Sequence, residues 1–573
     1  MMRERIWSTT RLLANNTRLQ PTQRALRCPG AKRWTTTSSS SSTTSASTTR
    51  QWSTPLAKNL GEAITTTGPI PVATYMRQCL TSMDGGYYTS APEGRDQFGQ
   101  KGDFVTSPEI SQVFGELIGL WVVAEWIAQG RKSEGVYLME MGPGRGTLMD
   151  DMLRTIRNFK PLAQAIQGIY LVEASPSLRQ RQHKLLCGDN PLEEIEIGYS
   201  STSKHSPDLK VIWCEDIRFV PRDANSTPFI FAHEFFDALP IHVFESVPPA
   251  PQQQPTEIQT RTGKHSLHPR ASSASKESQW RELVVSPTPP FSTHQTLGTP
   301  KSQQDQPVPD FQLTRAKAST PHSLYLPETS NRYKALKTTP GAVIEISPES
   351  LSYAAEFGVR IGGGESPVAS ALYTAAKENQ DISTIFHAST TPSQAPKAIE
   401  KQTPSGAALI LDYGTPASIP TNSLRGIKAH RIVSPLHEPG RVDLSADVDF
   451  IALAEAALNA SPGVEVHGPV DQARFLTAMG IQERVAQLVK VAIERSKGGL
   501  PGATSVDAGA VAGGKEELTQ VVKRIEGAWK RLVDVGPQGM GKLYQVMAIL
   551  PHKPLSSGQQ PRRPVGFGGD VQI

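Results

Sequence analysis

Cysteine is scarce in this chain of 573 residues, and long apolar runs are missing from it. The four cysteines lie far apart in the sequence, which excludes a disulfide scaffold and a Cys-rich zinc site. The most apolar stretch, residues 113–128, is interrupted by Glu116 and Glu125, so we expect no transmembrane helix and no stable membrane insertion. Only 6% of the residues are aromatic, but 38% are hydrophobic, which is enough to form a core.

Acidic residues are nearly missing from the first fifty positions. That segment holds nine basic side chains and one acid, Glu4, and so carries +8, whereas the whole chain carries +5. The remaining 523 residues have 50 basic and 53 acidic side chains, a net charge of −3. A folded part with this balance lacks the basic surface of a nucleic-acid-binding protein, so we expect no nucleic-acid partner.

Residues 1–54 are expected to form a mitochondrial transit peptide, or a disordered leader. They are rich in Arg, Ser and Thr and include the tract Ser38–Ser42. Such a segment cannot bury enough apolar surface to offset the entropy lost on ordering. Basic, Ser-rich and acid-poor composition is typical of mitochondrial transit peptides, whereas a secretory signal needs an apolar run of about 7–15 residues. A generic disordered tail is the alternative interpretation.

The rest of the chain alternates short apolar runs with helical patterns. Apolar runs occur at 136–141, 169–172, 211–213, 229–232 and 407–411. Strands that alternate with helices predict an α/β fold with a parallel, doubly wound sheet covered on both faces. We expect its first part at 55–247 and its second part at 341–552.

Several stretches interrupt this pattern and are rich in Pro, Gln, Ser, Gly or Ala. The range 248–340 is expected to be a low-complexity insertion, with one short ordered hairpin piece near 279–285. Residues 388–405 and 497–515 are expected to be disordered loops, and residues 553–573 a disordered tail.

A glycine loop after the first apolar run is the most informative segment. Gly142, Gly144 and Gly146 follow Glu140 and precede a helical pattern. Glycines let a backbone approach a ligand closely, and the N–H groups at a helix start face it. The spacing differs from the dinucleotide pattern G-x-G-x-x-G, and Glu140 would repel a pyrophosphate. S-adenosyl-L-methionine carries a cationic amino-acid group and no phosphate, so this loop predicts S-adenosyl-L-methionine as the cofactor.

Two further acids follow the next two apolar runs. Glu173 comes 27 residues after Gly146, where a nucleoside-binding α/β sheet places its ribose-binding carboxylate. Asp216 follows the third run and is expected to contact the adenine amine. The alternatives are that all three acids are structural, or that the loop binds a flavin or nicotinamide dinucleotide, which Glu140 disfavours.

The segment after the fourth run is polar and acidic. In a doubly wound sheet, ligands bind outside the carboxyl ends of the strands, so Glu234 and Asp237 should face the reactive end of the cofactor. Paired carboxylates suit an arginine acceptor, which stays protonated at neutral pH. We therefore predict Glu234 and Asp237 as catalytic residues. The alternative is that Glu234 caps the next helix.

The chain resembles the MidA family of mitochondrial protein-arginine methyltransferases, which assist respiratory complex I assembly. The resemblance covers most of residues 70–247, 279–285 and 406–550. Its motifs are Asp84 to Tyr88, Gly102 to Ser111, Glu140 to Thr147, Ala232 to Pro240, Leu411 to Gly414 and Asp443 to Phe450.

The resemblance implies a class I S-adenosylmethionine-dependent methyltransferase fold, Rossmann-like, with family-specific helical additions and disordered insertions. It further implies a location in the mitochondrial matrix and symmetric dimethylation of an arginine on a complex I subunit. Asp103, within a family motif, is expected to lie near the methionine ammonium group of the cofactor or else to form a structural turn.

Two other functions remain open alternatives. One is a small-molecule methyltransferase that uses the same cofactor site, and the other is a non-catalytic complex I assembly chaperone on the same fold. No metal is expected, because His233 and His437 have no second ligand at a metal-binding spacing.

Overall fold

The structure is a computed structural model of the chain. It describes residues 50–89, 103, 105–249, 256–260, 263–267, 277–364, 399–401, 403–496, 518–537, 539–554 and 562–569. The expected leader, apart from residues 50–54, lies outside the described residues, as do 388–398 of the expected loop 388–405 and all of the expected loop 497–515. Residues 399–401 and 403–405 correct the first loop, because Ile399 and Ser405 are buried and Lys401 donates to the Ser226 carbonyl oxygen at 2.7 Å. Within the described residues, no helix is both long enough and apolar enough to cross a bilayer.

A nine-stranded sheet forms the centre of the fold, in the order β18-β19-β14-β7-β2-β3-β6-β5-β4. Five neighbouring strands are parallel, and they contain the five predicted apolar runs. They are β2 (Val136–Met141), β3 (Ile166–Val172), β6 (Lys210–Cys214), β7 (Thr227–His233) and β14 (Ala407–Tyr413). The antiparallel strand β19 (Tyr544–Pro551) lies between β14 and β18 (Val464–Asp471), while β5 (Gly198–Thr202) and β4 (Glu193–Ile195) extend the other edge.

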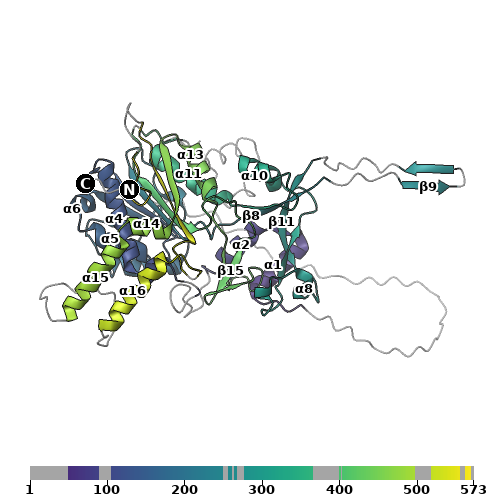
Figure 1. The fold of residues 1–573 in the computed structure, drawn as a ribbon, viewed down its shortest axis with the longest axis horizontal. Helices are drawn as coiled ribbons and strands as arrows, with labels where there is room; N and C mark the ends of the chain where they lie inside the picture. The colour runs from purple at the N-terminus through teal and green to yellow at the C-terminus, as the bar shows by residue number, and fades with distance from the viewer. Residues whose placement is uncertain are drawn as a thin grey trace, which may run out of the picture. The chain divides into compact units, whose positions relative to one another are not determined.

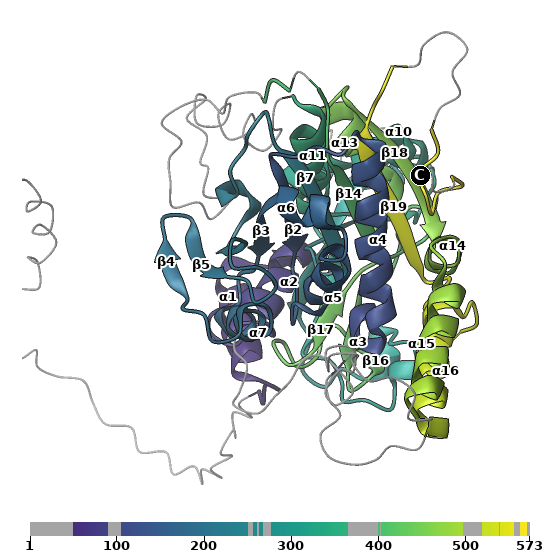
Figure 2. The ribbon, with the colours of Figure 1, turned by 90° about the vertical axis from the view of Figure 1, so that its left-hand side faces the viewer.

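Helices cover both faces of this sheet (Figures 1 and 2). Successive residues of β2 point to opposite faces, so Leu138 belongs to one core and Met139 to the other. The first core includes residues of α4 (Gln112–Ala128), α5 (Thr147–Ile156), α6 (Lys160–Ala165), α7 (Pro176–Cys187) and α14 (Gln472–Ala478). The second includes residues of α11 (Pro348–Gly362) and α13 (Phe450–Ala460). This is the predicted doubly wound α/β architecture.

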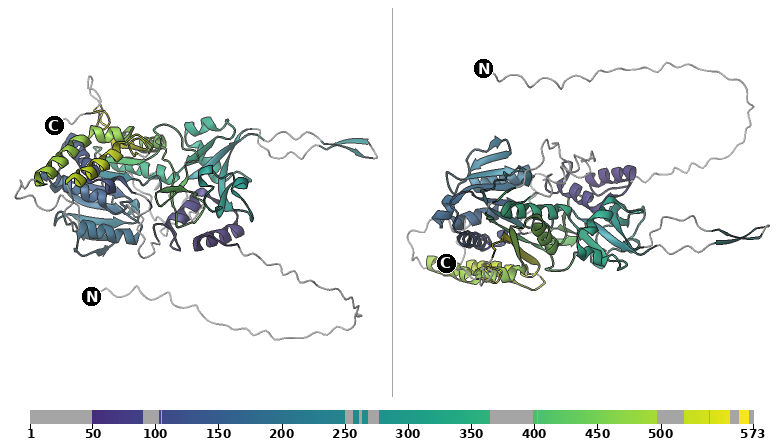
Figure 3. Two further views of the ribbon diagram at one scale, coloured as in Figure 1. Left: turned by 60° about the horizontal axis from the view of Figure 1, so that its bottom comes forward. Right: turned by 90° about the horizontal axis from the view of Figure 1, so that it is seen from above.

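Two further helices pack at the β18 side of the fold. α15 (Ile481–Ser496) and α16 (Leu518–Val533) lie side by side (Figure 3). Ile481, Val485 and Leu532 join the first core, so this helix pair is attached through apolar contacts. It matches the helical additions that the resemblance implied.

A second, smaller group of strands packs on α1 (Pro55–Thr67) and α2 (Val72–Thr81). β11 (Gln279–Pro287) pairs with β8 (His242–Val247), β12 (Phe311–Arg315) and β1 (Ile70–Pro71), and β8 also pairs with β13 (Val343–Ile346). β15 (Arg425–Lys428) forms a three-stranded sheet with β16 (Arg431–Val433) and β17 (Asp443–Ser445).

The structure corrects the expected insertion at 248–340. Residues 277–340 contain β11, β12 and the short helices α8 (His294–Leu297), α9 (Pro321–Tyr325) and α10 (Asn331–Leu336). Trp280, Phe311 and Tyr333 are buried and anchor this range. The Pro- and Ser-rich composition concealed these anchors, because each is a single residue whose packing partners lie far away in the sequence. Within 250–276, the described residues form a hairpin of β9 (Thr256–Thr260) and β10 (Gly263–Leu267).

The expected disordered tail at 553–573 also needs correction, because residues 562–569 pack on the fold. Arg562 forms an ion pair with the buried Glu125 of α4. Val565 is buried, and the ring of Phe567 lies 5.6 Å from that of Phe475. Residues 555–561 and 570–573 lie outside the described residues.

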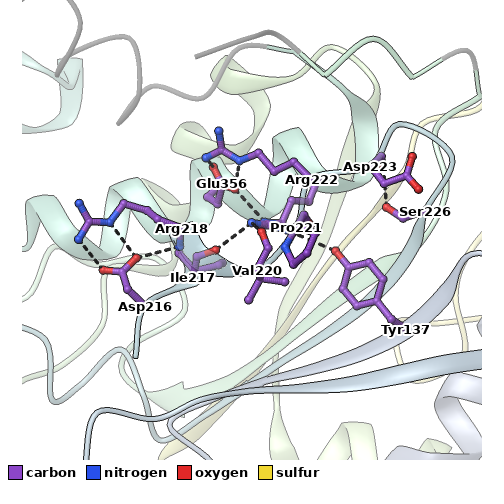
Figure 4. A network of polar contacts seen from close by, with 11 residues as sticks. Tyr137, Asp216, Ile217, Arg218, Val220, Pro221, Arg222, Asp223, Ser226 and Glu356 are labelled. Carbon is purple, nitrogen blue, oxygen red and sulfur yellow. Dashed lines mark hydrogen bonds and ion pairs between the residues drawn. The ribbon is translucent and has the colours of Figure 1, made fainter. Parts of the chain in front are cut away.

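A buried arginine, Arg360, fixes the loop that follows β6. Figure 4 labels its partners Ile217, Val220 and Glu356. Arg360 of α11 donates to the carbonyl oxygens of Ile217 and Val220, each at 2.9 Å, and to Glu356 Oε1 at 2.8 Å. Glu356 also accepts two hydrogen bonds from Arg222, at 2.9 and 2.7 Å. The network therefore ties the end of the third parallel strand to a helix on the second face of the sheet.

Replacing this arginine should destabilise the fold strongly. Arg360→Met leaves buried carbonyl groups without a donor and Glu356 without its inner cation, so we expect a loss of about 3–5 kcal/mol in the free energy of unfolding. Arg315→Met, which breaks the more exposed pair with Glu245, should cost less than about 1 kcal/mol. Urea denaturation of both variants measures the difference, and equal losses would contradict the assigned role.

Candidate functional site

A cavity of about 320 Å³ lies at the carboxyl ends of the parallel strands. This is the edge where a doubly wound sheet binds its ligands. Six of the nine predicted site residues line it: Glu140, Gly142, Gly144, Glu173, Glu234 and Asp237. The structure therefore brings the predicted cofactor loop and the predicted catalytic pair to the same cavity.

The glycine loop joins β2 to α5 in a conformation that other residues rarely adopt. Gly142, Gly144 and Gly146 have φ angles of 55°, 53° and 83°. A Cβ atom on Gly142 would lie 3.0 Å from Phe235 Cδ2, tighter than an ordinary contact. Both the left-handed backbone and the close approach of an aromatic ring require glycine here.

Glu140 is the last residue but one of β2, and its buried side chain lines the cavity. Its Oε2 atom is buried and has no hydrogen-bond partner among the described residues. Burial, followed by the nearby negative charge of Glu173, raises the pKa of Glu140 to about 8. An unpaired buried carboxyl group costs free energy unless a ligand satisfies it. The site therefore fits a cationic ligand group such as an ammonium.

Glu173 follows β3 and is held by two hydrogen bonds. Its Oε1 atom accepts from the Ser175 backbone N–H at 2.7 Å, and its Oε2 atom accepts from Gln182 Nε2 at 2.9 Å. Burial raises the pKa of Glu173 to about 7, although these two hydrogen bonds oppose the shift. A carboxylate has about four lone-pair positions, so Glu173 can still accept from a ligand hydroxyl group such as that of a ribose.

Three predicted cofactor residues do not line the cavity. Asp216 instead caps a short 3-10 helix: its carboxylate accepts from the Arg218 backbone N–H at 2.8 Å and pairs with the Arg218 guanidinium (Figure 4). Its neighbour Glu215 lines the cavity. Asp103 accepts from the Tyr87 hydroxyl at 2.7 Å and from the Ala429 N–H at 2.9 Å. Gly146 packs against Gln182, behind the loop.

The predicted catalytic pair is buried on both sides of a short turn after β7. Glu234 adopts a left-handed backbone with φ of 50°, and its Oε1 atom accepts from the Tyr544 hydroxyl at 2.8 Å. Asp237 Oδ2 accepts from the Ser445 hydroxyl at 2.9 Å. Burial raises the pKa of both groups, and Arg425 opposes the shift of Asp237. The negative charge of Asp237 adds to the shift of Glu234, and both charges raise the pKa of the neighbouring Asp412. A strained non-glycine residue at a ligand-facing turn is typical of a functional site.

Residues that the sequence analysis did not assign complete the site. Asp412 is fully buried and accepts the backbone N–H groups of Phe235 and Phe236, at 3.1 and 2.8 Å, so it holds the turn that carries the pair. Asp443 lines the cavity and accepts from the Tyr88 hydroxyl at 2.9 Å; burial raises its pKa to about 8. Both acids lie in motifs that carry the family resemblance, and this was the feature of the sequence that could have identified them as site residues.

The charge around the cavity is mainly negative. Two arginines lie near these acids: Arg145 lines the cavity and pairs with Glu109 at 3.3 Å, and the partly buried Arg425 has its Nη1 atom 2.5 Å from Asp447 Oδ1. Its guanidinium also lies 5.2 Å from the centre of the Tyr413 ring. Carboxyl groups that share a buried space and too few cations attract a positively charged ligand.

Away from the cavity, the structure groups three side chains that the sequence analysis did not connect. The ligand atoms of His242, Glu282 and His322 lie within 4.8 Å of one another. His242 Nδ1 is 2.7 Å from Glu282 Oε1, and Thr320 donates to Glu282 Oε2. Both carboxylate oxygens are thus hydrogen-bonded inside the protein.

Comparisons with known proteins agree with this geometry. The family model Methyltransf_28, described as "Putative S-adenosyl-L-methionine-dependent methyltransferase", matches residues 117–470. Protein arginine methyltransferase NDUFAF7, mitochondrial, of Mus musculus is 31% identical over 514 residues, which cover 89% of this chain and 87% of the relative. The Drosophila melanogaster homolog is 30% identical and covers 77% of this chain and 78% of the relative.

A solved structure shows the same fold. It is a protein from Burkholderia thailandensis bound to S-adenosyl-homocysteine, with a TM-score of 0.52 and 20% sequence identity. The match covers 90% of this chain and 93% of the solved chain. The predicted fold class and the predicted cofactor, S-adenosyl-L-methionine, are confirmed by the family model together with this neighbour.

Glu140→Gln should change cofactor affinity and stability in opposite directions. A raised pKa means that stability falls as the pH rises from about 4.5 to about 8, because the group ionises freely in the unfolded chain while burial opposes its ionisation in the folded protein. The neutral amide avoids that charge, so at pH 8 the variant should have a higher melting temperature than the wild type.

The same variant should bind S-adenosyl-L-methionine about 10- to 100-fold more weakly at pH 8, the effect of losing one charged partner. Wild-type affinity should increase from pH 6 to 8 as Glu140 ionises, and the variant should lose that part of the increase. The titration of the ligand itself is common to both proteins and cancels in the comparison. Calorimetry across this range measures both, and parallel pH profiles would contradict the assignment.

Proposed function

We infer that this chain, which belongs to the Methyltransf_28 family of S-adenosyl-L-methionine-dependent methyltransferases, methylates arginine side chains of a mitochondrial protein. The observation that carries the proposal is the pair of the buried Asp237 and Glu234, whose side chain is only 10% exposed, in one cavity with the glycine loop. The names of the relatives from mouse and fruit fly, both protein arginine methyltransferases of mitochondria, support the choice of substrate and compartment.

The chemistry of the acceptor explains why the acids are buried together. An arginine guanidinium stays protonated at neutral pH and offers five N–H donors, so carboxylates can bind it and concentrate its charge. S-adenosyl-L-methionine, when bound, supplies a methyl group on a positively charged sulfur. Glu140 and Glu173 would hold its amino-acid and ribose groups, which leaves Glu234 and Asp237 for the acceptor.

Proton transfer is the second task of the pair. An acceptor nitrogen that gains a methyl group must lose one proton, and a carboxyl group with a raised pKa is a suitable base near neutral pH. Burial raises the pKa of Glu234 well above its usual value, and the Tyr544 hydroxyl holds Oε1 in place. We assign proton acceptance to Glu234, and binding of the guanidinium to Asp237 together with Glu234.

The finer features of the function follow from the family resemblance. We propose that the product is a symmetric dimethylarginine on a complex I subunit, and that the reaction takes place in the mitochondrial matrix. The Arg-rich, acid-poor start of the chain supports import, and the net charge of −3 on the remaining residues suits a basic substrate segment. The transit peptide would then end before Trp52 rather than at residue 54, because the Trp52 ring stacks on Phe311 and the buried Thr54 caps α1.

Neutralising either acid should abolish methyl transfer without abolishing cofactor binding. We expect Glu234→Gln and Asp237→Asn to lower kcat by about 100-fold or more, the usual contribution of a positioned base or charged group. Affinity for S-adenosyl-homocysteine should stay within about threefold of the wild type. Glu455→Gln, outside the cavity, is the matched control and should retain full activity. Transfer of a radiolabelled methyl group to mitochondrial protein is the assay.

The substrate can be identified by mass spectrometry of complex I subunits. Mitochondria that contain the protein should carry a symmetric dimethylarginine that is missing when the protein is deleted, and Glu234→Gln should not restore it. If methylated small molecules change instead, the enzyme acts on a metabolite. If assembly of complex I requires the protein but survives Glu234→Gln, the function is that of a chaperone.

A further inference from the structure

Gln182 occupies an unusual place in the helix that follows β3. Leu178, Gln182 and Leu186 are spaced four residues apart on α7, so they share the face that packs on the sheet. All three are buried, and Gln182 is fully inaccessible to solvent. A buried amide in an apolar row costs free energy unless all of its hydrogen-bonding groups are satisfied.

Every group of this amide has a partner. Gln182 Nε2 donates to the Gly144 carbonyl oxygen at 2.7 Å and to Glu173 Oε2 at 2.9 Å. Gln182 Oε1 accepts from Trp213 Nε1 at 3.0 Å. An indole N–H can only donate, so Trp213 settles which end of the amide is oxygen and turns both N–H groups toward the loop and the acid.

The amide therefore joins two parts of the cavity that come from different strands. Gly144 belongs to the loop after β2, and Glu173 follows β3. The backbone of Gly146 packs against the same side chain, since a Cβ atom there would lie 3.4 Å from Gln182 Cγ. Gln182 thus contacts the back of the loop while lying outside the cavity lining.

We propose that Gln182 is a positioning residue for cofactor binding, which holds the glycine loop and the Glu173 carboxylate at the spacing that a nucleoside with an amino-acid tail requires. The proposal rests on S-adenosyl-L-methionine as the cofactor and is independent of the acceptor. One hydrogen bond fixes the loop carbonyl. The other fixes the rotation of the carboxylate, so that its remaining lone pairs face the cavity and need no reordering when the ligand arrives.

Gln182→Met tests the proposal, because methionine has a similar length and lacks the amide. The full chain with this substitution should bind S-adenosyl-homocysteine about 10- to 100-fold more weakly in calorimetry, as expected for the loss of a hydrogen bond to a charged group. Gln180→Met is the matched control: Gln180 lies on the same helix, two residues away and exposed, and the variant should bind like the wild type.

Steady-state kinetics separate positioning from general damage. With Gln182→Met, the KM for S-adenosyl-L-methionine should rise by the same factor as the dissociation constant, while kcat at saturation should stay within about threefold of the wild type. A variant that binds S-adenosyl-homocysteine within twofold of the wild type would overturn the proposal. A lower kcat with an unchanged KM would also overturn it, because a residue that positions the cofactor site should change KM and leave kcat nearly unchanged.

Gln182→Asn keeps the test decisive if the methionine variant does not fold. Asparagine retains a polar amide but is one methylene shorter, so its N–H groups withdraw from Gly144 and Glu173. We expect weaker S-adenosyl-homocysteine binding, by about tenfold, in a protein that unfolds at a lower temperature than the wild type but is folded at the temperature of the binding measurement. Unchanged binding by the asparagine variant would overturn the proposal.

Discussion

Burial of several carboxyl groups at one edge of a parallel sheet is the constraint on which the rest of the site depends. Parallel strands end at the same edge, so acids placed after β2, β3 and β7 must converge there. Burial raises the pKa of Glu140, Glu173 and Glu234, and repulsion from a neighbouring acid adds to the shift of Glu140 and Glu234. The Oε2 atom of Glu140 has no hydrogen-bond partner among the described residues, and few cations lie near these acids. A positively charged ligand would therefore lower the free energy of the site.

The scaffold around the cavity serves to keep these acids in place. Asp412 holds the turn that carries Glu234 and Asp237 through backbone N–H groups, and Tyr544 holds Glu234 through its hydroxyl. On the other side of the sheet, Arg360 fixes the loop after β6 through carbonyl oxygens. These supports use elements of the second half of the chain to position loops of the first half. Precise placement of charged groups requires such rigid surroundings, since a small displacement of a group considerably weakens its interaction with a ligand.

The sequence predicted the sheet and most of the cavity, because both depend on local patterns. Apolar runs mark the five parallel strands, and the acid-glycine spacing marks the loop. The sequence could not show which of the adjacent acids Glu215 and Asp216 lines the cavity. The direction of each side chain depends on where the strand ends. Residues 277–340 were misjudged because β11 pairs with β8, a strand far away in the sequence. Gln182 was missed because its partners Gly144 and Trp213 lie on separate elements.

The last strands of the sheet have a consequence for how the protein is made. β19 lies between β14 and β18 and supplies Tyr544, and residues 562–569 pack on α4. A ribosome that synthesises the chain from its N-terminus therefore releases these pieces last. Until then β14 has an open edge, which exposes unpaired backbone groups to other chains. Contacts between residues so distant in sequence also form slowly. The edge of β14 must therefore be protected from aggregation from the time that residues 407–413 are made until β19 pairs with it, and the site becomes complete only then.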